Sequence, residues 1–323
     1  MTTQISILGL DSIGQSLGLA LSARDFPVTG FSPQPETAQA AQKRGAVRQV
    51  KWNMAHAVKG AHLTLVCLPL AEQRDALDAV AQDFMPGSAV VSVSPLLAAP
   101  LKWAAEVLPA DRHFIALHPL LSPARPFEEG QGLSPSADLF KQGQWAIAPS
   151  ATCAPEALEL VTGLANVTGA SPYFVDPVEH DGLIGGASAL PVLLAKVLMD
   201  AATASPGWTE MRKVAEHNFA TATAALGDEQ ALAALRFNRE NALRYLDAAL
   251  AELKSLREKL AAEDPAALAE ALNEAAARRA AWLADYARGD WETPESPAAP
   301  LPTPGGELKR FLVGGLFDRQ KKK

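Results

Sequence analysis

Two glycines near the start of the chain have the spacing of a phosphate-binding turn. They belong to the segment Gly9-Leu10-Asp11-Ser12-Ile13-Gly14, which follows a short apolar run and precedes a helical pattern. In a Rossmann unit, a glycine-rich turn at this point lets the amides and the dipole of the first helix face the pyrophosphate of a dinucleotide. Asp11 replaces the middle glycine, so a carboxylate stands where an anion would bind, and Asp11 can instead cap the helix. The motif alone leaves two interpretations open: a dinucleotide site, or a turn kept only for strand–helix packing.

The ribose-binding position of such a unit lies at the end of the second strand. An acidic residue there binds the 2′-hydroxyl of NAD, whereas an arginine accommodates the 2′-phosphate of NADP. This chain has Ser32 at the expected position, followed by Gln34. Neither side chain selects between the two cofactors, so NAD and NADP both stay open.

His118 ends an apolar run in the segment Ile115-Ala116-Leu117-His118-Pro119. The carboxyl end of a parallel strand is where ligands of α/β sheets bind. The pKa of histidine suits it to take a proton from an alcohol while a hydride leaves the same carbon. The simpler alternative is a strand-end histidine that hydrogen bonds hold in place.

Two further groups are candidates for binding a substrate. His180-Asp181 opens a long helical pattern, and Ser188 follows on the same face at helical spacing. A site role and helix-start capping are equally good explanations for this pair. Arg212-Lys213 is a basic pair that would serve an acidic substrate, although such pairs are more often a solvated face.

The elements that must position these residues alternate between strand and helix in the first half of the chain. The predicted strands cover residues 5–8, 27–31, 62–68, 89–93, 114–117 and 145–148, and the predicted helices cover residues 13–23, 36–44, 72–83 and 101–107. This alternation is typical of βαβ units, which form a mostly parallel sheet covered on both faces. We therefore predict an α/β, Rossmann-type, doubly wound domain over residues 1–175.

The remainder of the chain is predicted to be helical up to residue 288. A long helical pattern runs from Pro177 to about Ala204 with a break at Pro191, and Asp264-Pro265 marks a new helix start. A stripe of leucines at residues 243, 246, 250, 253, 256 and 260 predicts a core or a helix–helix interface. Residues 176–288 are therefore expected to form an all-helical substrate and dimerisation domain, and residues 289–323 a Pro-rich linker with a basic tail.

Composition excludes several classes of protein. The 323 residues include 29 basic and 36 acidic side chains, and the net charge of −7 argues against nucleic acid or an anionic membrane as a partner. Cys67 and Cys153 provide neither a disulfide framework nor a zinc site, so no metal is expected. No run approaches the roughly 18 uninterrupted apolar residues of a membrane span. The N-terminus lacks a basic export signal, so we expect a cytoplasmic protein.

Taken in order, these segments resemble the prephenate/arogenate dehydrogenase family over nearly all of residues 4–288. The strongest match is Asp176-Pro177-Val178-Glu179-His180-Asp181 followed by Ser188-Ala189-Leu190-Pro191. The other matching stretches are Ile7-Leu8-Gly9-Leu10, residues 13–17, residues 30–36, Leu68-Pro69, His118-Pro119-Leu120, residues 136–140 and Asn238-Arg239-Glu240.

The resemblance implies an NAD(P)-linked oxidative decarboxylation in tyrosine biosynthesis. In this scheme His118 takes the hydroxyl proton of a small acidic, prephenate-like substrate, and loss of carbon dioxide makes the ring aromatic. The residues implied to contact that substrate are His180, Ser188, Arg212 and Lys213. The residues implied to hold the cofactor are Gly9, Leu10, Asp11, Ile13, Gly14, Ser32, Gln34, Leu68 and Pro69. The family's helical domain also implies a homodimer.

Three departures from the family pattern fall at expected contact positions. The family's Ser-His-Leu-Pro-His segment is Ser188-Ala189-Leu190-Pro191-Val192 here, so both histidines are absent. The segment that usually reads Gly-Ser-Val-Lys is Pro95-Leu96-Leu97-Ala98, which lacks a hydroxyl and a cation. Asp11 is the third departure. The alternative function is therefore a catalytically faded relative that binds a nucleotide or regulates without catalysis.

Overall fold

The computed structural model describes residues 3–122, 133–227 and 229–288, and these form two compact units. The first unit contains the chain up to Leu121 and continues, beyond the gap, to Asp181. The second unit begins at Gly182 and contains the remaining helices. The linker and tail predicted for residues 289–323 lie outside the described residues.

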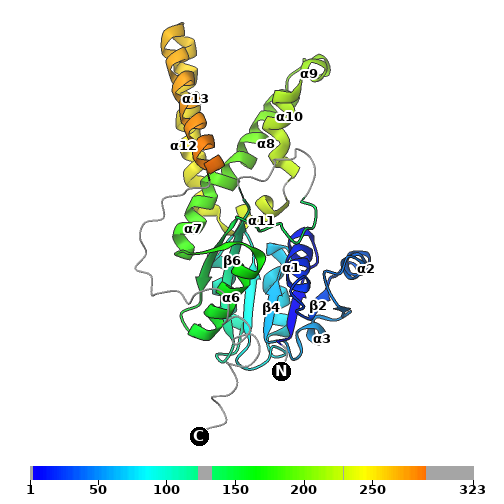
Figure 1. Ribbon diagram of the computed structural model, residues 1–323. Coiled ribbons are helices and arrows are strands. Elements are labelled where there is room, and N and C mark those ends of the chain that lie inside the picture. The colour runs from blue at the N-terminus through cyan, green and yellow to red at the C-terminus, as the bar shows by residue number, and fades with distance from the viewer. Residues whose placement is uncertain (1–2, 123–132, 228, 289–323) are drawn as a thin grey trace. The chain divides into compact units, whose positions relative to one another are not determined.

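The first unit is built on one sheet whose strand order is β3-β2-β1-β4-β5-β6-β7-β8 (Figure 1). The strands are β1 Ile5–Leu8, β2 Val28–Phe31, β3 Gln49–Val50, β4 Leu63–Val66, β5 Ala89–Val93, β6 His113–Leu120, β7 Gln144–Pro149 and β8 Ser171–Phe174. Neighbouring strands run parallel except for β6 and β7, which are antiparallel. The predicted mostly parallel, Rossmann-type sheet is confirmed.

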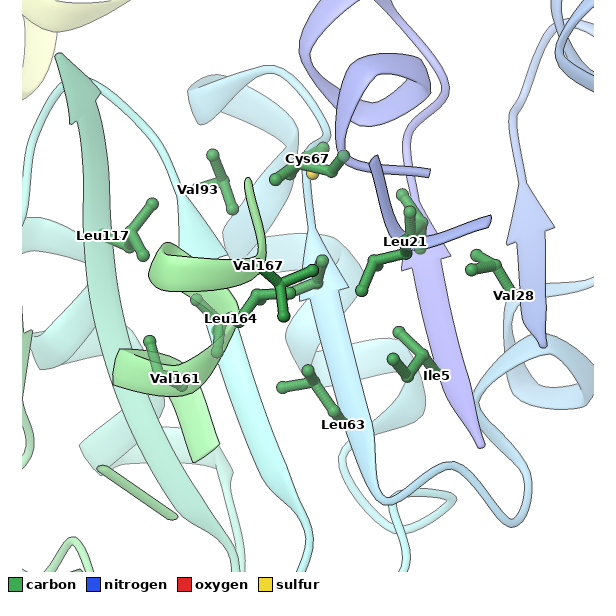
Figure 2. Close-up of a cluster of buried hydrophobic side chains, with 14 of the residues drawn as sticks. Ile5, Leu21, Val28, Leu63, Cys67, Val93, Leu117, Val161, Leu164 and Val167 are labelled. Atoms are coloured by element: carbon green, nitrogen blue, oxygen red, sulfur yellow. The ribbon is translucent and has the colours of Figure 1, made fainter. Parts of the chain in front are cut away.

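Helices cover both faces of this sheet. The helices of the first unit are α1 Ser12–Ser22, α2 Pro35–Lys43, α3 Met54–Val58, α4 Leu70–Val80, α5 Ala98–Val107 and α6 Pro155–Thr168, and α7 Pro177–Ile184 begins there. One buried cluster joins the sheet to α1, α2 and α6, and a second joins it to α3, α4 and α5. In Figure 2, Leu21 of α1 and Val161, Leu164 and Val167 of α6 lie among strand side chains of the first cluster. Because helices cover both faces, every residue of the central strands β1 and β4 is buried, rather than every second one.

Two strands and two helices of the first unit were not predicted from the sequence. β3 has two residues, and β8 contains Pro172, which is tolerated because β8 lies at an edge of the sheet. α6 carries standard signals, with Pro155 in its first turn and Gly169 in the left-handed conformation after its last residue. The other unpredicted helix is α3, which has only five residues.

The secondary-structure elements described in the second unit are all helices, as predicted. Its helices after α7 are α8 Leu190–Thr203, α9 Trp208–Val214, α10 His217–Thr223, α11 Glu229–Phe237, α12 Arg239–Ala261 and α13 Pro265–Arg288. The break expected at Pro191 takes the form of a π-helix, Gly185–Ala189, after which α8 begins with Pro191 in its first turn. The predicted helix start at Asp264-Pro265 is confirmed, because Asp264 Oδ1 accepts hydrogen bonds from the amides of Ala266 and Ala267 at 3.1 and 3.0 Å.

The stretch Pro177–Thr203 is long and apolar enough to cross a membrane by length and composition alone. About a third of its most apolar window, 33%, is buried within the protein. Its first turns carry His180 and Asp181, which are also buried. Core helices of soluble proteins pass the same test, so this stretch is weak evidence for a membrane.

Candidate active site

The predicted cofactor residues of the first unit and His118 meet at one edge of the sheet. Gly9–Gly14 follow β1, Ser32 and Gln34 follow β2, Leu68 and Pro69 follow β4, and His118 lies in the second half of β6. These strands are parallel, so their carboxyl ends share an edge. In open α/β sheets this is the edge at which ligands bind.

The turn after β1 requires both of its glycines. Gly9 has a φ of +95°, and a Cβ atom there would lie 2.5 Å from the carbonyl carbon of Cys67. A Cβ atom on Gly14 would lie 2.0 Å from the carbonyl oxygen of Gly9. Glycine therefore lets the first turn of α1 pack directly against the turn and the end of β4.

Asp11 caps the helix that this turn begins. Its Oδ1 atom accepts a hydrogen bond from the Gly14 amide at 2.9 Å, in the usual N-cap arrangement. Desolvation raises the pKa of Asp11, while hydrogen bonds from the Gly14 and Ile13 amides lower it in part. The capping role proposed from the sequence is confirmed, and the amides that face an anion in a Rossmann turn are engaged by the protein's own carboxylate.

The ends of β2 and β4 present neutral groups. Ser32 is buried, and its hydroxyl donates to Gln34 Oε1 at 3.2 Å and accepts from the Gln34 amide at 3.3 Å. Leu68 is buried, and Pro69 immediately precedes α4. The buried Gln73 of α4 donates to the carbonyls of Leu68 and Val93 at 2.9 and 3.1 Å, which fixes the ends of β4 and β5 relative to each other.

His118 is half-buried and contacts a second histidine. Its Nδ1 atom lies 3.1 Å from His180 Nε2, and the two rings meet edge to face with centroids 5.2 Å apart. Desolvation lowers the pKa of His118 to about 3, and the neighbouring His180 contributes to this shift. The ring is therefore neutral near pH 7 and able to accept a proton.

His180 links His118 to Asp181. Its Nδ1 atom lies 3.0 Å from Asp181 Oδ1, and both side chains are buried. Because a carboxylate only accepts hydrogen bonds, His180 Nδ1 is the donor of this pair. The two residues are adjacent in α7, whose start is capped by Asp176 Oδ1 accepting from the amides of Val178 and Glu179, both at 2.9 Å.

Asp181 also binds the start of a different helix. Its Oδ1 and Oδ2 atoms accept from the amides of Leu97 and Ala98 at 2.8 and 3.0 Å, at the N-terminus of α5. No side chain of α5 or its N-cap residue caps this end. The capping alternative for His180-Asp181 thus holds for Asp181, although the capped helix is α5 and not α7. The Pro95–Ala98 segment, which lacks the family's hydroxyl and cation, contributes backbone amides instead.

Three of the predicted substrate residues lie in the second unit. Ser188 is half-buried in the π-helix. Arg212 and Lys213 are exposed in the last turn of α9, where Lys213 Nζ donates to Glu210 Oε2 at 2.7 Å. Their contact with a substrate stays a prediction, as does that of His180. Within the described ranges, no group of three or more His, Cys, Asp and Glu side chains could hold a metal ion.

No local sequence pattern predicts the contact between His118 and His180, or the bonds of Asp181 to the Leu97 and Ala98 amides. Both link segments that are at least 62 residues apart along the chain. The one available signal was the His-Asp dipeptide, since a histidine beside a carboxylate is a common arrangement for orienting a base.

Comparison with known proteins identifies a related family. Residues 17–173 match the family model described as prephenate dehydrogenase, nucleotide-binding domain. The prephenate dehydrogenase of Bacillus subtilis (strain 168) is 24% identical over 204 residues, which cover 62% of this chain and 53% of that protein. The chain thus matches about half the length of this relative. The family-model match begins after the turn that contains Asp11.

Solved structures share the fold at low sequence identity. Synechocystis arogenate dehydrogenase superposes with a TM-score of 0.70 at 21% identity, over 87% of this chain and 100% of that chain. The prephenate dehydrogenase from A. aeolicus, in complex with hydroxyphenyl propionate and NAD+, gives a TM-score of 0.75 at 18% identity, over 86% of this chain and 98% of that chain. The chain is thus similar to prephenate and arogenate dehydrogenases: residues 17–173 match the nucleotide-binding domain of the former, and solved structures of both share its fold.

Proposed function

We propose that this chain is an NAD(P)-dependent dehydrogenase that oxidatively decarboxylates prephenate or arogenate, in the pathway to tyrosine. The observation that carries the proposal is the position of His118. It stands at the ligand-binding edge of the sheet as a neutral imidazole, with one ring nitrogen held by His180. No hydrogen bond to the other ring nitrogen, Nε2, occurs among the residues that the structure describes.

The residues at this edge fit a nicotinamide dinucleotide. Gly9 and Gly14 keep the turn free of Cβ atoms, and Ser32 with Gln34 offers neutral hydroxyl and amide groups at the ribose position. Asp11 opposes an anion, but it is exposed and its bonds are to its own helix, so rotation of its side chain frees the helix amides. The residues proposed to hold the cofactor are Gly9, Leu10, Asp11, Ile13, Gly14, Ser32, Gln34, Leu68 and Pro69. When bound, the cofactor accepts a hydride from the carbon that carries the substrate hydroxyl.

His118 Nε2 takes the hydroxyl proton as the hydride leaves that carbon. The bond to the carboxylate then breaks, carbon dioxide departs, and the electron pair makes the ring aromatic. The phenolate oxygen recovers the proton from His118, so the residue is neutral again at the end of the cycle. A base that acts in this way contributes about 10²–10⁴-fold to the rate.

The second unit is proposed to bind the acidic end of the substrate and a second copy of the chain. Arg212 and Lys213 supply cations for a carboxylate, and Ser188 supplies a hydroxyl.

The dimer is proposed to form through α12 and α13, whose exposed apolar side chains include Leu250, Leu253 and Trp282. Light scattering should then give twice the chain mass of 34.1 kDa, and the chain mass itself would contradict the dimer. The location is proposed to be cytoplasmic.

The test is steady-state turnover of prephenate and of arogenate with NAD and with NADP, followed by the absorbance of the reduced nicotinamide. The wild type should turn over one of the four combinations, and His118→Gln should lower kcat about 10²–10⁴-fold with little change in nucleotide affinity. His56→Gln, an exposed histidine of α3, is the matched control and should behave as the wild type. A wild type that binds a nucleotide but turns over neither substrate would favour the non-catalytic alternative.

A further inference from the structure

The base of this site is connected to a buried carboxylate through a second histidine. Asp181 accepts two backbone amides at the start of α5 and a third hydrogen bond from His180 Nδ1. Each of these three N–H groups needs a lone pair on a carboxylate oxygen of Asp181. Asp181 is therefore suited to remain an acceptor and to hold the proton of His180 on Nδ1.

This arrangement fixes the protonation of both rings in the resting site. With its proton on Nδ1, a neutral His180 has a lone pair on Nε2. His180 Nε2 then accepts from His118 Nδ1 across the 3.1 Å contact, so His118 carries its proton on Nδ1. The lone pair of His118 consequently lies on Nε2, the nitrogen that the proposed reaction needs as a base.

We infer that His180 is the residue on which the positive charge rests during the reaction, and that Asp181 is the carboxylate that stabilises it there. The inference rests on the proposed function. The substrate O–H bond breaks as His118 Nε2–H forms, while His118 Nδ1–H breaks as His180 Nε2–H forms. His118 stays neutral with its tautomer exchanged, and His180 becomes an imidazolium beside Asp181. The transfer runs in reverse when the phenolate oxygen recovers its proton.

The energetics favour this location of the charge. A cation on His118 would be desolvated, as the lowered pKa of His118 reflects, and it would face a second histidine. A cation on His180 is in direct contact with a carboxylate at 3.0 Å. The transfer from His118 to His180 occurs along a contact that is already formed at 3.1 Å, so neither ring has to move.

The direct test is ¹⁵N NMR of the full-length protein with labelled histidines, without substrate. His118→Gln and His180→Gln spectra assign the signals. In the resting protein we expect His118 protonated on Nδ1 and unprotonated on Nε2. On acidification, the first proton taken up by the pair should make His180 doubly protonated, while His118 stays neutral and exchanges its proton from Nδ1 to Nε2. A doubly protonated His118, or a resting His118 protonated on Nε2, would overturn the inference.

Turnover supplies a second readout. In His180→Gln, the side-chain carbonyl can still accept from His118 Nδ1 but cannot take a proton, so orientation is kept and the relay is lost. We expect kcat to fall about 100-fold, with KM and nucleotide affinity within about threefold of the wild type. A folded His180→Gln protein with wild-type kcat would refute the relay. A wild type without turnover would refute the proposed function instead, and the NMR titration would still decide where the proton rests.

Discussion

Two helices at the same edge of the sheet begin with a carboxylate cap, and the two caps differ in origin. Asp11 immediately precedes α1 and accepts a hydrogen bond from the Gly14 amide, three residues further along the chain; Asp11 is exposed to solvent. Asp181 accepts from the amides of Leu97 and Ala98 at the start of α5, which lie 84 and 83 residues before it in the chain, and it is only 6% exposed. Asp11 bonds only within its own turn among the contacts described above, whereas Asp181 also holds His180.

The difference separates a cap that can be released from one that cannot. Removing the Asp11 carboxylate from the amides of α1 leaves them open to solvent or to an anionic ligand. Removing Asp181 would strand two amides and a histidine donor in a buried site, where unpaired polar groups are costly. The first cap is therefore compatible with a binding site. The second is part of the fold and holds the histidine that contacts His118, the proposed base.

The largest expected effect is on stability at the buried cap. Asp181→Ala should lower the free energy of unfolding by about 3 kcal/mol, because three donors lose their acceptor. Asp176→Ala is the matched control: it removes the exposed cap of α7 and should cost about 1 kcal/mol. Urea unfolding of the full chain, followed by circular dichroism, measures both. Equal losses of unfolding free energy in the two variants would show that the buried cap of α5 stabilises the protein no more than the exposed cap of α7 does.

A smaller effect is expected on nucleotide binding at the exposed cap. Asp11→Gly should tighten the Kd for NAD or NADP about tenfold, since it removes a charge and frees the Gly14 amide, while costing only a few tenths of a kcal/mol of stability. Asp11→Asn removes the charge but keeps the cap, so it should tighten binding less. Titration calorimetry on the three proteins measures this order. Unchanged affinity in Asp11→Gly would eliminate Asp11 as an obstacle to the cofactor.

The smallest effect is the pH dependence of that binding. Desolvation raises the pKa of Asp11, so its carboxylate gains a proton earlier than usual as the pH falls. Protonation removes the repulsion, and nucleotide affinity should therefore rise as the pH falls, by less than tenfold per pH unit because one proton is involved. Asp11→Asn should lack this component, so the ratio of the two Kd values should change with pH. A constant ratio would contradict the role of the Asp11 charge.

Sequence patterns predicted most of the first unit because the buried strands and their glycine and proline signals are local. They also identified Asp11 as a possible cap and placed His118 at the end of its strand, although β6 continues for two residues to Leu120. They could not show that Asp181 caps α5, since that contact joins segments more than 80 residues apart. For the same physical reason, the link from His118 to His180 became visible only in the folded chain.

The proposed cofactor site requires that the Asp11 cap of α1 give way to a dinucleotide. A crystal structure of the protein grown with excess NAD or NADP tests this directly. We expect the pyrophosphate at the Gly9–Gly14 turn, with the Asp11 carboxylate rotated away from the Gly14 amide. Density that keeps Asp11 on that amide, with no nucleotide along the carboxyl edge of the sheet, would contradict the account.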